Sequence, residues 1–326
     1  MKNYTKAINM LKNAETVAIF MHINPDGDCI GSSLALYAFL TKIGKTVHCF
    51  SASNETNGVP QKLAFLPFSD VFNNNKLKSY DLSIGVDVAD ANRLGDNLFK
   101  IFLSGKTSLV FDHHEGYIDF AKHTVREVNS ASTTQILYKV LSEYDKNVID
   151  TDIATLLYAG IVTDSGCFSF SSTSKETHMI AADLFDYEID YNDMNYRLLR
   201  DIPKNVFNLK MRVLSKANFY EDGQIAAIVF RNDDFAQTDT YENNTDGIIN
   251  SILDISKVEI AISIAEIGDK KFKVSFRTKD KVNASACAKC FGGGGHANAA
   301  GCRVYGFFED AYQKVINVAK EMLSYA

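Results

Sequence analysis

The chain has 326 residues, of which 46% are hydrophobic and 23% charged, and its formal net charge at pH 7 is -6. This composition excludes a largely disordered chain, and the length predicts two domains with separate cores. The acidic balance argues against a long contact with duplex nucleic acid, which needs many Lys and Arg side chains, but it leaves room for a short anionic substrate. No apolar run is long enough for a bilayer and the first residues are polar, so we expect a soluble, cytoplasmic protein without membrane contact.

The N-terminal half alternates short apolar runs with helical patterns, from about residue 16 to residue 184. Continuous apolar runs are typical of strands that are covered on both faces. This half therefore predicts an α/β fold with a doubly wound, mainly parallel sheet and helices on both sides. In chain order we expect strands at 17–21, 46–50, 82–86 and 108–111, and helices at 31–43, 132–143 and 153–162.

The C-terminal part begins after a charged, helical segment at 187–215, in which Pro203 lies near a helix start. This segment predicts a helical linker. We therefore expect one domain at 1–186, the linker at 187–215 and a smaller mixed α/β domain at 216–326. Within the second domain the patterns predict strands at 224–230, 258–266 and 271–277 and helices at 283–289 and 309–323.

The six cysteines do not form a disulfide framework in a chain of this length. Only Cys287-x-x-Cys290 has a spacing that suits metal or redox chemistry, and no second pair of Cys or His accompanies it. Two free thiols on a helix are therefore the favoured interpretation. The remaining four are expected to be small buried residues, namely Cys29, Cys49, Cys167 and Cys302.

Residues that bind metals or protons follow the expected strands. Residues 22–28 follow the first strand, 87–90 and 112–114 follow two later strands, and Asp164 follows a helix. Ligands of an open parallel sheet collect outside the carboxyl ends of its strands. We therefore expect one pocket to gather these residues.

Two divalent metal ions are the simplest explanation for so many carboxylates in one pocket, because unneutralised carboxylates would repel one another. Each residue alone is more often a structural hydrogen-bond partner, but their joint occurrence at strand ends favours ligands. Since the set has oxygen and nitrogen donors and no thiolate, Mn²⁺ is favoured, with Mg²⁺, Co²⁺ or Zn²⁺ as alternatives. The available groups are His22, Asp26, Asp28, Asp87, His113 and Asp164, with Asp90, Asp112 and His114 beside them.

A second chemical motif is the run of glycines at 292–295, followed by His296. Four glycines allow backbone N–H groups to approach an anion closely, so the run predicts a phosphate-binding nest. The small residues after His296 predict the start of a tightly packed helix.

Five motifs in order resemble those of the DHH phosphoesterase superfamily, and most closely its two-domain members with a DHH-associated C-terminal domain. Members of this kind act as oligoribonucleases and as phosphatases of adenosine 3′,5′-bisphosphate. The motifs are HxNPDGD at 22–28, VDVAD at 86–90, DHH at 112–114, TDSG at 163–166 and GGGGHxxAAG at 292–301.

The resemblance implies roles for the residues of the metal pocket. His22 and Asp26 would bind one metal ion and Asp87 would bridge to the other. Asp28, His113 and Asp164 would complete the second position. Asp112 would orient a ligating imidazole, as expected of a carboxylate beside a metal ligand. His114 would face the substrate.

The resemblance also implies substrate contacts and an active site in the cleft between the domains. The glycine motif would bind substrate phosphate through Gly293, Gly294, Gly295 and His296. Arg277 would lie beside the terminal nucleotide, and Arg93 would help to hold a phosphate. Such a cleft favours short ligands.

The expected activity is metal-dependent hydrolysis of short oligoribonucleotides to nucleoside 5′-monophosphates, and of adenosine 3′,5′-bisphosphate to AMP. An alternative is a stand-alone phosphodiesterase for cyclic di-AMP. An inorganic pyrophosphatase or polyphosphatase is less favoured, because the pyrophosphatase relatives replace the glycine motif with a basic one. A non-catalytic nucleotide-binding or oligomerisation protein is disfavoured by the complete ligand set. The resemblance is compatible with a homodimer.

Overall fold

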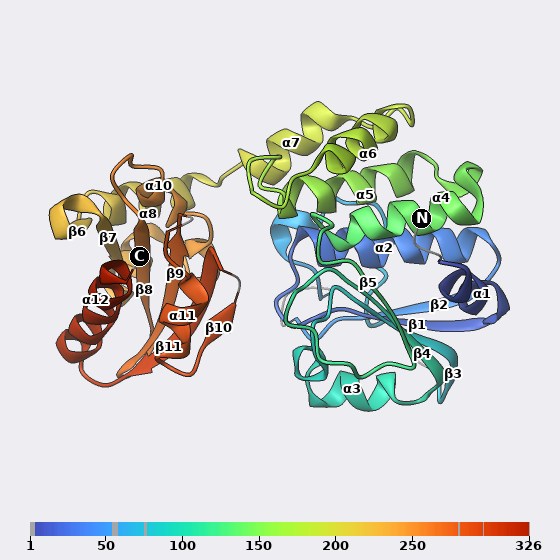
Figure 1. The fold of residues 1–326 in the computed structure, drawn as a ribbon, viewed down its shortest axis with the longest axis horizontal. Coiled ribbons are helices and arrows are strands. Elements are labelled where there is room, and N and C mark those ends of the chain that lie inside the picture. The colour runs from blue at the N-terminus through green and yellow to red at the C-terminus, as the bar shows by residue number, and fades with distance from the viewer. Residues whose placement is uncertain (1–3, 54–57, 75–76, 280, 296, 326) are drawn as a thin grey trace. The chain divides into compact units, whose positions relative to one another are not determined.

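The computed structural model describes residues 4–53, 58–74, 77–279, 281–295 and 297–325. The chain forms two compact units that divide after Asp201. Figure 1 draws the first unit in blue to yellow-green and the second in yellow to red. No helix among the described residues is both long and apolar enough to cross a membrane.

The first unit contains a five-stranded sheet with the order β2-β1-β3-β4-β5, and every neighbouring pair is parallel. The predicted parallel sheet is therefore confirmed. The edge strand β5 was not predicted, because it is only four residues long and mostly polar. The strands are β1 (Thr16–Phe20), β2 (Thr46–Phe50), β3 (Tyr80–Val86), β4 (Gly105–Asp112) and β5 (His123–Arg126).

Helices cover both faces of this sheet. Val17 and Ile19 of β1 join the larger core with α1, α2, α4 and α5, whereas Ala18 and Phe20 join a smaller core with α3. Figure 1 shows α2, α4 and α5 on one face of the sheet and α3 on the other. The helices are α1 (Thr5–Asn13), α2 (Gly27–Lys42), α3 (Asp96–Phe102), α4 (Thr133–Asp145), α5 (Thr151–Asp164), α6 (Lys175–Phe185) and α7 (Tyr191–Leu199), with short 3-10 turns η2 (Gln61–Leu63), η3 (Ala91–Leu94) and η4 (Lys146–Val148).

The strand order creates a switch point between β1 and β3. In the sheet, β2 lies on one side of β1 and β3 lies on the other. The connection from β1 leads to β2, and the connection from β3 leads in the opposite direction, to β4. In doubly wound sheets, the crevice at the carboxyl ends of two such strands is the usual ligand site. The residues that follow β1 and β3 are therefore placed side by side at this crevice.

The second unit contains a six-stranded mixed sheet with the order β10-β11-β9-β8-β7-β6. Only β7 and β8 pair in parallel, and the other pairs are antiparallel. The predicted mixed α/β character is confirmed. The elements are α8 (Lys204–Leu214), β6 (Asn218–Tyr220), η5 (Glu221–Gly223), β7 (Ile225–Phe230), α9 (Asn232–Thr238), η6 (Glu242–Thr245), α10 (Asn250–Leu253), β8 (Ile260–Gly268), β9 (Lys271–Thr278), α11 (Ala284–Lys289), β10 (Gly294–Gly295), β11 (Ala299–Tyr305) and α12 (Phe308–Ser324).

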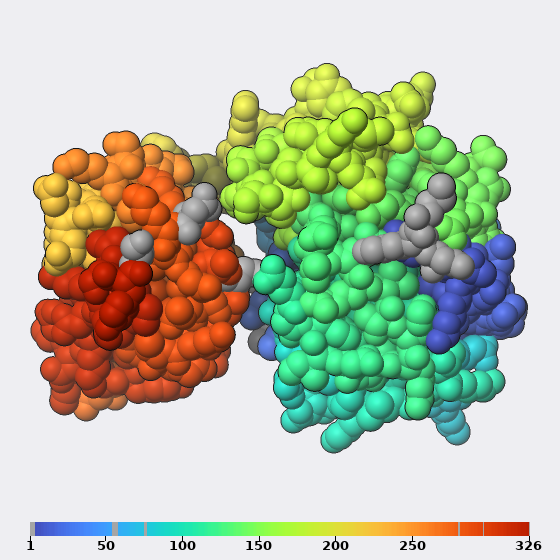
Figure 2. Space-filling view, viewed as in Figure 1, coloured from blue at the N-terminus to red at the C-terminus, as the bar shows by residue number. Residues whose placement is uncertain are grey.

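The segment predicted as a linker is divided between the two units. Met194 and Leu198 of α7 are buried in the large core of the first unit. Leu209 and Val213 of α8 are buried against β7 and β8 in the second. The apolar face of α7 therefore packs on the first unit, and the apolar face of α8 packs on the second. Figure 2 shows α6 and α7, in yellow-green, at the surface of the first unit.

Candidate metal centre

The predicted metal ligands lie at the carboxyl ends of the strands of the first unit. His22 follows β1, Asp87 follows β3, and His113 follows β4. Asp28 lies in the first turn of α2, and Asp164 is the last residue of α5. The fold therefore brings four separate segments of the sequence to one crevice.

Asp87 lies at the centre of this cluster. Its Oδ2 atom lies 3.5 Å from Nε2 of His22, and its Oδ1 atom lies 3.6 Å from Nε2 of His113. Asp87 is 2% exposed and has φ 58°, a left-handed backbone conformation that is uncommon outside glycine. Such strain is often found at functional sites. Nδ1 of His114 also lies 3.6 Å from Oδ1. One oxygen of the carboxylate thus faces His22 and the other faces His113 and His114, which suits a bridging ligand.

Both imidazoles are oriented by backbone carbonyls. Nδ1 of His22 lies 2.8 Å from the carbonyl oxygen of Ile23, and Nδ1 of His113 lies 3.2 Å from that of Ser130. Because a carbonyl only accepts, each Nδ1 is the protonated nitrogen. Nε2 of each ring is left to bind a metal ion. A hydrogen bond from the other ring nitrogen to a carbonyl oxygen is typical of metal-binding histidines.

Asp28, His113 and Asp164 form a second set of three donors, with one ligand atom from each within 4.8 Å of the others. His113 and Asp164 are in contact, with Nε2 of the ring 3.1 Å from Oδ2 of the carboxylate. The carboxylate of Asp28 is fully buried and accepts a hydrogen bond from the backbone N–H of Thr133 at 2.6 Å. Gly160 of α5 leaves room for the Asp28 carboxylate, since a Cβ atom at position 160 would lie only 2.6 Å from Oδ1 of Asp28.

Burial and mutual charge shift the pKa values of these carboxyl groups in opposite directions. Burial and the charges of Asp87 and Asp164 raise the pKa of Asp28 well above its ordinary value. Burial alone would raise the pKa of Asp87, but the imidazoles of His22, His114 and His113 lower it.

The pKa values of the imidazoles reflect the same crowding. Burial lowers the pKa of His113, but the hydrogen bond to Asp164 and the charge of Asp87 outweigh it and raise the pKa to about 10. The imidazoles thus balance part of the negative charge of the pocket. Buried carboxylates and imidazoles in close contact fit the donor chemistry of divalent cations.

Asp112 contacts His114 and not one of the predicted metal-binding imidazoles. Oδ1 of Asp112 accepts the backbone N–H of His114 at 2.7 Å, and Oδ2 lies 3.2 Å from Nδ1 of the ring. Asp112 is fully buried, whereas His114 is only partly buried. The predicted orienting contact is therefore directed at the histidine that was expected to face the substrate, and the orienting contact of His113 comes from Ser130.

Asp26 and Cys29 occupy positions that sequence reasoning did not anticipate. Asp26 is the N-cap of α2, and its Oδ1 atom accepts the backbone N–H of Cys29 at 3.0 Å. One ligand atom each from His22, Cys29 and Asp87 lies within 4.8 Å of the others, and all three residues are buried. A sulfur atom thus lies beside the predicted oxygen and nitrogen donors. The missed signal was the helical spacing, which places Cys29 at the end of α2 that faces the strands.

Arg93 lies in η3, next to the loop that carries the first motif. Its carbonyl oxygen accepts the backbone N–H of Ile23 at 2.7 Å. The Nε atom of Arg93 is buried and has no hydrogen-bond partner among the described residues. The backbone of Arg93 is thus bonded to the loop that follows β1, and its predicted phosphate contact stays a prediction.

The last glycines of the run form β10, which pairs with β11. The small residues at 299–301 begin β11 and not the predicted helix. Gly294 pairs with Gly301 and Gly295 with Ala300 in the antiparallel contact of β10 and β11. A Cβ atom at Gly293 would lie 2.3 Å from the carbonyl oxygen of Gly301. Glycine and alanine here allow two strands to approach closely, so the small residues serve sheet packing. His296 lies outside the described residues.

Arg277 lies on β9, in the same sheet as the glycine hairpin. It pairs in register with Ala299 of β11, and its Nη1 atom donates to the carbonyl oxygen of Phe276 at 3.1 Å. Burial lowers the pKa of Arg277, while the charge of Asp246 opposes this shift. Arg277 thus lies on the strand next to β11, and β11 separates it from the glycines of β10. Cys287 and Cys290 are free thiols, as expected, but Cys167 is exposed and not buried as predicted.

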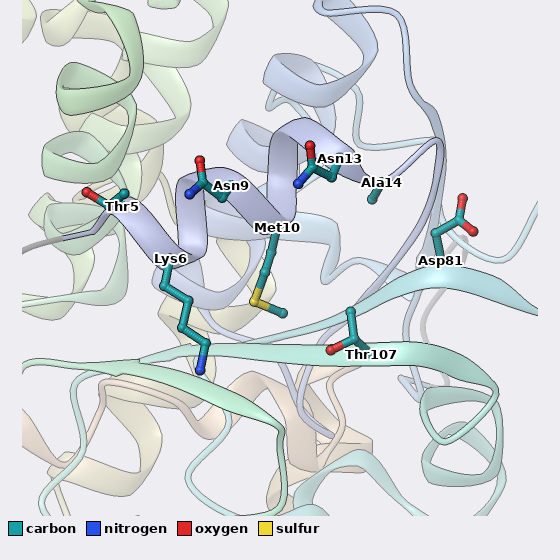
Figure 3. A pocket seen from close by; sticks show the side chains of 8 residues that line it. All are labelled: Thr5, Lys6, Asn9, Met10, Asn13, Ala14, Asp81 and Thr107. Atoms are coloured by element: carbon teal, nitrogen blue, oxygen red, sulfur yellow. The ribbon is translucent and has the colours of Figure 1, made fainter.

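An open groove of about 660 Å³ lies elsewhere on the first unit. Figure 3 shows Asn9, Met10 and Asn13 of α1 along one side, and Asp81 and Thr107 on the other. Asp81 and Thr107 lie near the amino ends of β3 and β4, whereas the metal-binding candidates lie at the carboxyl ends. The groove is therefore separate from the metal centre.

Both units have counterparts among known proteins. Residues 16–161 match the DHH family N-terminal domain, and residues 223–324 match the DHHA1 domain. The bifunctional oligoribonuclease and PAP phosphatase NrnA of Thermus thermophilus is 30% identical over 320 residues, which are 95% of this chain and 91% of that protein. The protein of the same description from Bacillus subtilis is 25% identical over 308 residues, 94% of each chain.

A solved structure resembles the whole chain as well. An exopolyphosphatase-related protein from Bacteroides fragilis has a TM-score of 0.90 and 25% sequence identity, and the match covers 97% of this chain and 95% of that one. The order of the strand-end motifs, the two matched domains and the full-length similarity agree with one another. The chain therefore belongs to the DHH family, with a DHHA1 domain following its DHH domain.

Proposed function

We propose that this protein is a metal-dependent phosphoesterase that hydrolyses short oligoribonucleotides to nucleoside 5′-monophosphates and converts adenosine 3′,5′-bisphosphate to AMP. The observation that carries this proposal is the position of Asp87, whose two carboxylate oxygens face His22 and His113. The relatives from Thermus thermophilus and Bacillus subtilis, which are described as oligoribonucleases and PAP phosphatases, support the choice of substrate.

Two groups of donors would hold two divalent cations. Asp28, His113 and Asp164 would hold one, and His22 would hold the other, with Asp87 shared between them. When bound, such cations supply the Lewis acidity that activates water and neutralises phosphoryl charge. Mn²⁺ suits the position that has only oxygen and nitrogen donors. Asp26, which caps α2 through Oδ1, would join His22 at this position.

His114 is the candidate proton donor to the leaving oxygen. Asp112 fixes its ring through Nδ1, at 3.2 Å, and fixes its backbone through the N–H, at 2.7 Å. The ring is thereby oriented with Nε2 available for a substrate oxygen. A positioned acid of this kind contributes about 10²–10⁴-fold to a rate.

The second unit would bind the phosphates of the substrate. Gly294 and Gly295 of β10 would approach a phosphate with their backbone, whereas the N–H of Gly293 already donates to the carbonyl oxygen of Ala288 at 2.9 Å. Arg277 would offer a cation from β9, which β11 separates from β10. His296 belongs to the same motif in the sequence. Arg93 of the first unit is proposed to contact a phosphate near the metals. A homodimer and a cytoplasmic location stay predictions.

A substrate panel tests this function. The full chain would be incubated with Mn²⁺ and, in separate reactions, with pApA, adenosine 3′,5′-bisphosphate, cyclic di-AMP, pyrophosphate and polyphosphate. We expect the highest kcat/KM for pApA and the bisphosphate. Dominant turnover of pyrophosphate or polyphosphate would overturn the proposal, and dominant turnover of cyclic di-AMP would replace it with the phosphodiesterase alternative.

A further inference from the structure

Three buried donor atoms of different chemistry meet beneath the carboxyl ends of β1 and β3. His22, Cys29 and Asp87 are 2%, 0% and 2% exposed, and one ligand atom from each lies within 4.8 Å of the other two. A nitrogen, a sulfur and an oxygen donor at such separations can reach one tetrahedral cation, for which metal–ligand bonds are about 2.0–2.3 Å.

The donor atoms of this cluster are free to point at a cation. Nδ1 of His22 is occupied by the carbonyl of Ile23, which leaves Nε2 directed at Oδ2 of Asp87, 3.5 Å away. Sγ of Cys29 lies 3.6 Å from the carbonyl oxygen of Val86. That contact uses the thiol proton and leaves the sulfur lone pairs available.

The backbone also holds Cys29 in place. Its N–H donates to the N-cap Asp26 at 3.0 Å, at the beginning of α2. Because Val86 ends β3 and directly precedes Asp87, the contact of Sγ with Val86 ties the thiol to the bridging carboxylate. Helix α2 and strand β3 therefore fix the distance between sulfur and carboxylate.

We propose that Cys29 is a thiolate ligand of the metal position formed by His22 and Asp87, and that it makes this position selective for softer cations such as Zn²⁺, Co²⁺ or Fe²⁺. The proposal rests on the metal-dependent function proposed above. On binding, a metal–sulfur bond replaces the S–H bond, and the proton passes to the solvent.

The two metal positions then differ in chemistry. The set of Asp28, His113 and Asp164 has only oxygen and nitrogen donors, which suit Mn²⁺ and Mg²⁺, whereas the set with Cys29 includes a soft donor. The chain is thus expected to take two different metals when both kinds are offered. Cys49 provides a comparison, because it is equally buried, at 1%, but it belongs to no group of metal-binding side chains among the described residues.

Cobalt substitution tests the proposal directly. The full chain, freed of metal with a chelator, would be titrated with Co²⁺ and its absorption recorded. Cys29→Ala and Cys29→Ser are the test variants, and Cys49→Ser and Cys290→Ser are the matched controls for a buried and an exposed thiol. Circular dichroism melting verifies that each variant folds, and serine retains nearly the volume of cysteine.

We expect wild type and both controls to show a near-ultraviolet thiolate-to-cobalt charge-transfer band beside the visible cobalt bands. Both Cys29 variants should lose the charge-transfer band and keep visible bands. Zn²⁺ affinity should fall by at least about tenfold in these variants, while Mn²⁺ affinity should change less than about threefold.

The outcomes separate the two proposals. Visible cobalt bands without a charge-transfer band in wild type, or a charge-transfer band that survives in Cys29→Ser, would overturn the role of Cys29 and leave the metal centre intact. Absence of any Co²⁺, Zn²⁺ or Mn²⁺ binding at equimolar concentration would overturn the metal centre itself.

Discussion

Thr134 holds Asp28 through two hydrogen bonds to the same carboxylate oxygen. The backbone N–H of Thr134 donates to Oδ1 of Asp28 at 2.9 Å, and its hydroxyl donates to the same atom at 2.7 Å. Thr133 donates its N–H to the other oxygen, so the amino end of α4 surrounds the carboxylate with donors. A helix amino end stabilises negative charge, which offsets part of the cost of burying Asp28.

Thr134→Val should therefore weaken metal binding without unfolding the protein. Valine keeps the shape of threonine but removes one donor to Oδ1, so Asp28 would be less firmly oriented. We expect the affinity for Mn²⁺ to fall by about 10–100-fold, as is typical when a residue that orients a metal ligand is changed. Isothermal titration with Mn²⁺ measures the change.

Thr173→Val is the matched control for this substitution. The hydroxyl of Thr173 is buried and has no hydrogen-bond partner among the described residues, so no bond is lost when it is removed. Its Mn²⁺ affinity should equal that of wild type. If Thr134→Val also bound Mn²⁺ as wild type does, the hydroxyl of Thr134 would have no part in the site.

Asp87→Asn should remove both metal binding and hydrolysis. The amide has one oxygen and no negative charge, so it cannot bridge two cations between His22 and His113. We expect hydrolysis of pApA to fall at least about 100-fold, since the two-metal arrangement would be lost. Metal analysis of the purified protein should show fewer than two divalent ions per chain.

The exposed Asp254 offers a comparison for the loss of one carboxylate. Asp254→Asn also removes one negative charge, but at the end of α10, far in sequence from the metal-binding candidates. This substitution should change neither metal content nor activity. Full activity and an unchanged metal content in Asp87→Asn would rule out the bridging role.

The glycine hairpin offers two neighbouring substitutions with opposite structural effects. Gly293→Ala places a methyl group 2.3 Å from the carbonyl oxygen of Gly301, whereas Gly294→Ala meets no atom within 4 Å. We expect Gly293→Ala to lower the free energy of unfolding by about 1–3 kcal/mol, as overpacking does. Thermal unfolding of the two variants measures this difference.

Gly294→Ala should retain wild-type stability and instead raise KM for pApA, because the added methyl group would lie where the proposed phosphate approaches the backbone. Equal melting temperatures for Gly293→Ala and wild type would contradict the hairpin geometry. An unchanged KM in Gly294→Ala would contradict only the phosphate contact.

Asp234 is expected to give the second unit a dependence of stability on pH. Its carboxylate accepts hydrogen bonds from Arg212 at 2.6 Å and from Lys216 at 2.8 Å. Burial raises the pKa of Asp234, but Lys216, the backbone N–H of Arg231 and the side chain of Arg212 lower it below the ordinary value. The stabilisation is therefore complete above the pKa of the unfolded chain, about 3.9, and is lost as the pH falls through the lower pKa of the folded state.

Asp234→Asn should lower the free energy of unfolding at pH 7 by about 1–3 kcal/mol, since hydrogen bonds to a charged group are lost. The difference from wild type should shrink as the pH falls below about 4, when the wild-type carboxylate becomes protonated. The neighbouring Asp233→Asn is the control, because the Asp233 side chain is 67% exposed and contacts Arg212 at the surface. A difference in stability that stays constant between pH 7 and pH 3 would contradict the charge effect.

Much of the first unit was predictable because of how parallel sheets are buried. β1, β3 and β4 are covered on both faces, so their sequences are continuous apolar runs. β5 escaped prediction because an edge strand of four mostly polar residues resembles a loop. β10 and β11 escaped prediction because glycine and alanine have a low preference for strands. β11 is a strand because it pairs with β9, and β10 is a strand because it pairs with β11.

The sequence by itself determined which kinds of side chain follow β1, β3 and β4, because the apolar runs end where carboxylates and imidazoles begin. Only the tertiary structure decided which of these atoms face one another. β2 separates β1 from β3 in the chain, yet β1 and β3 are hydrogen-bonded neighbours, so His22 and Asp87 meet through pairing between segments far apart in sequence. The same pairing, together with the first turn of α2, brings Cys29 to that position.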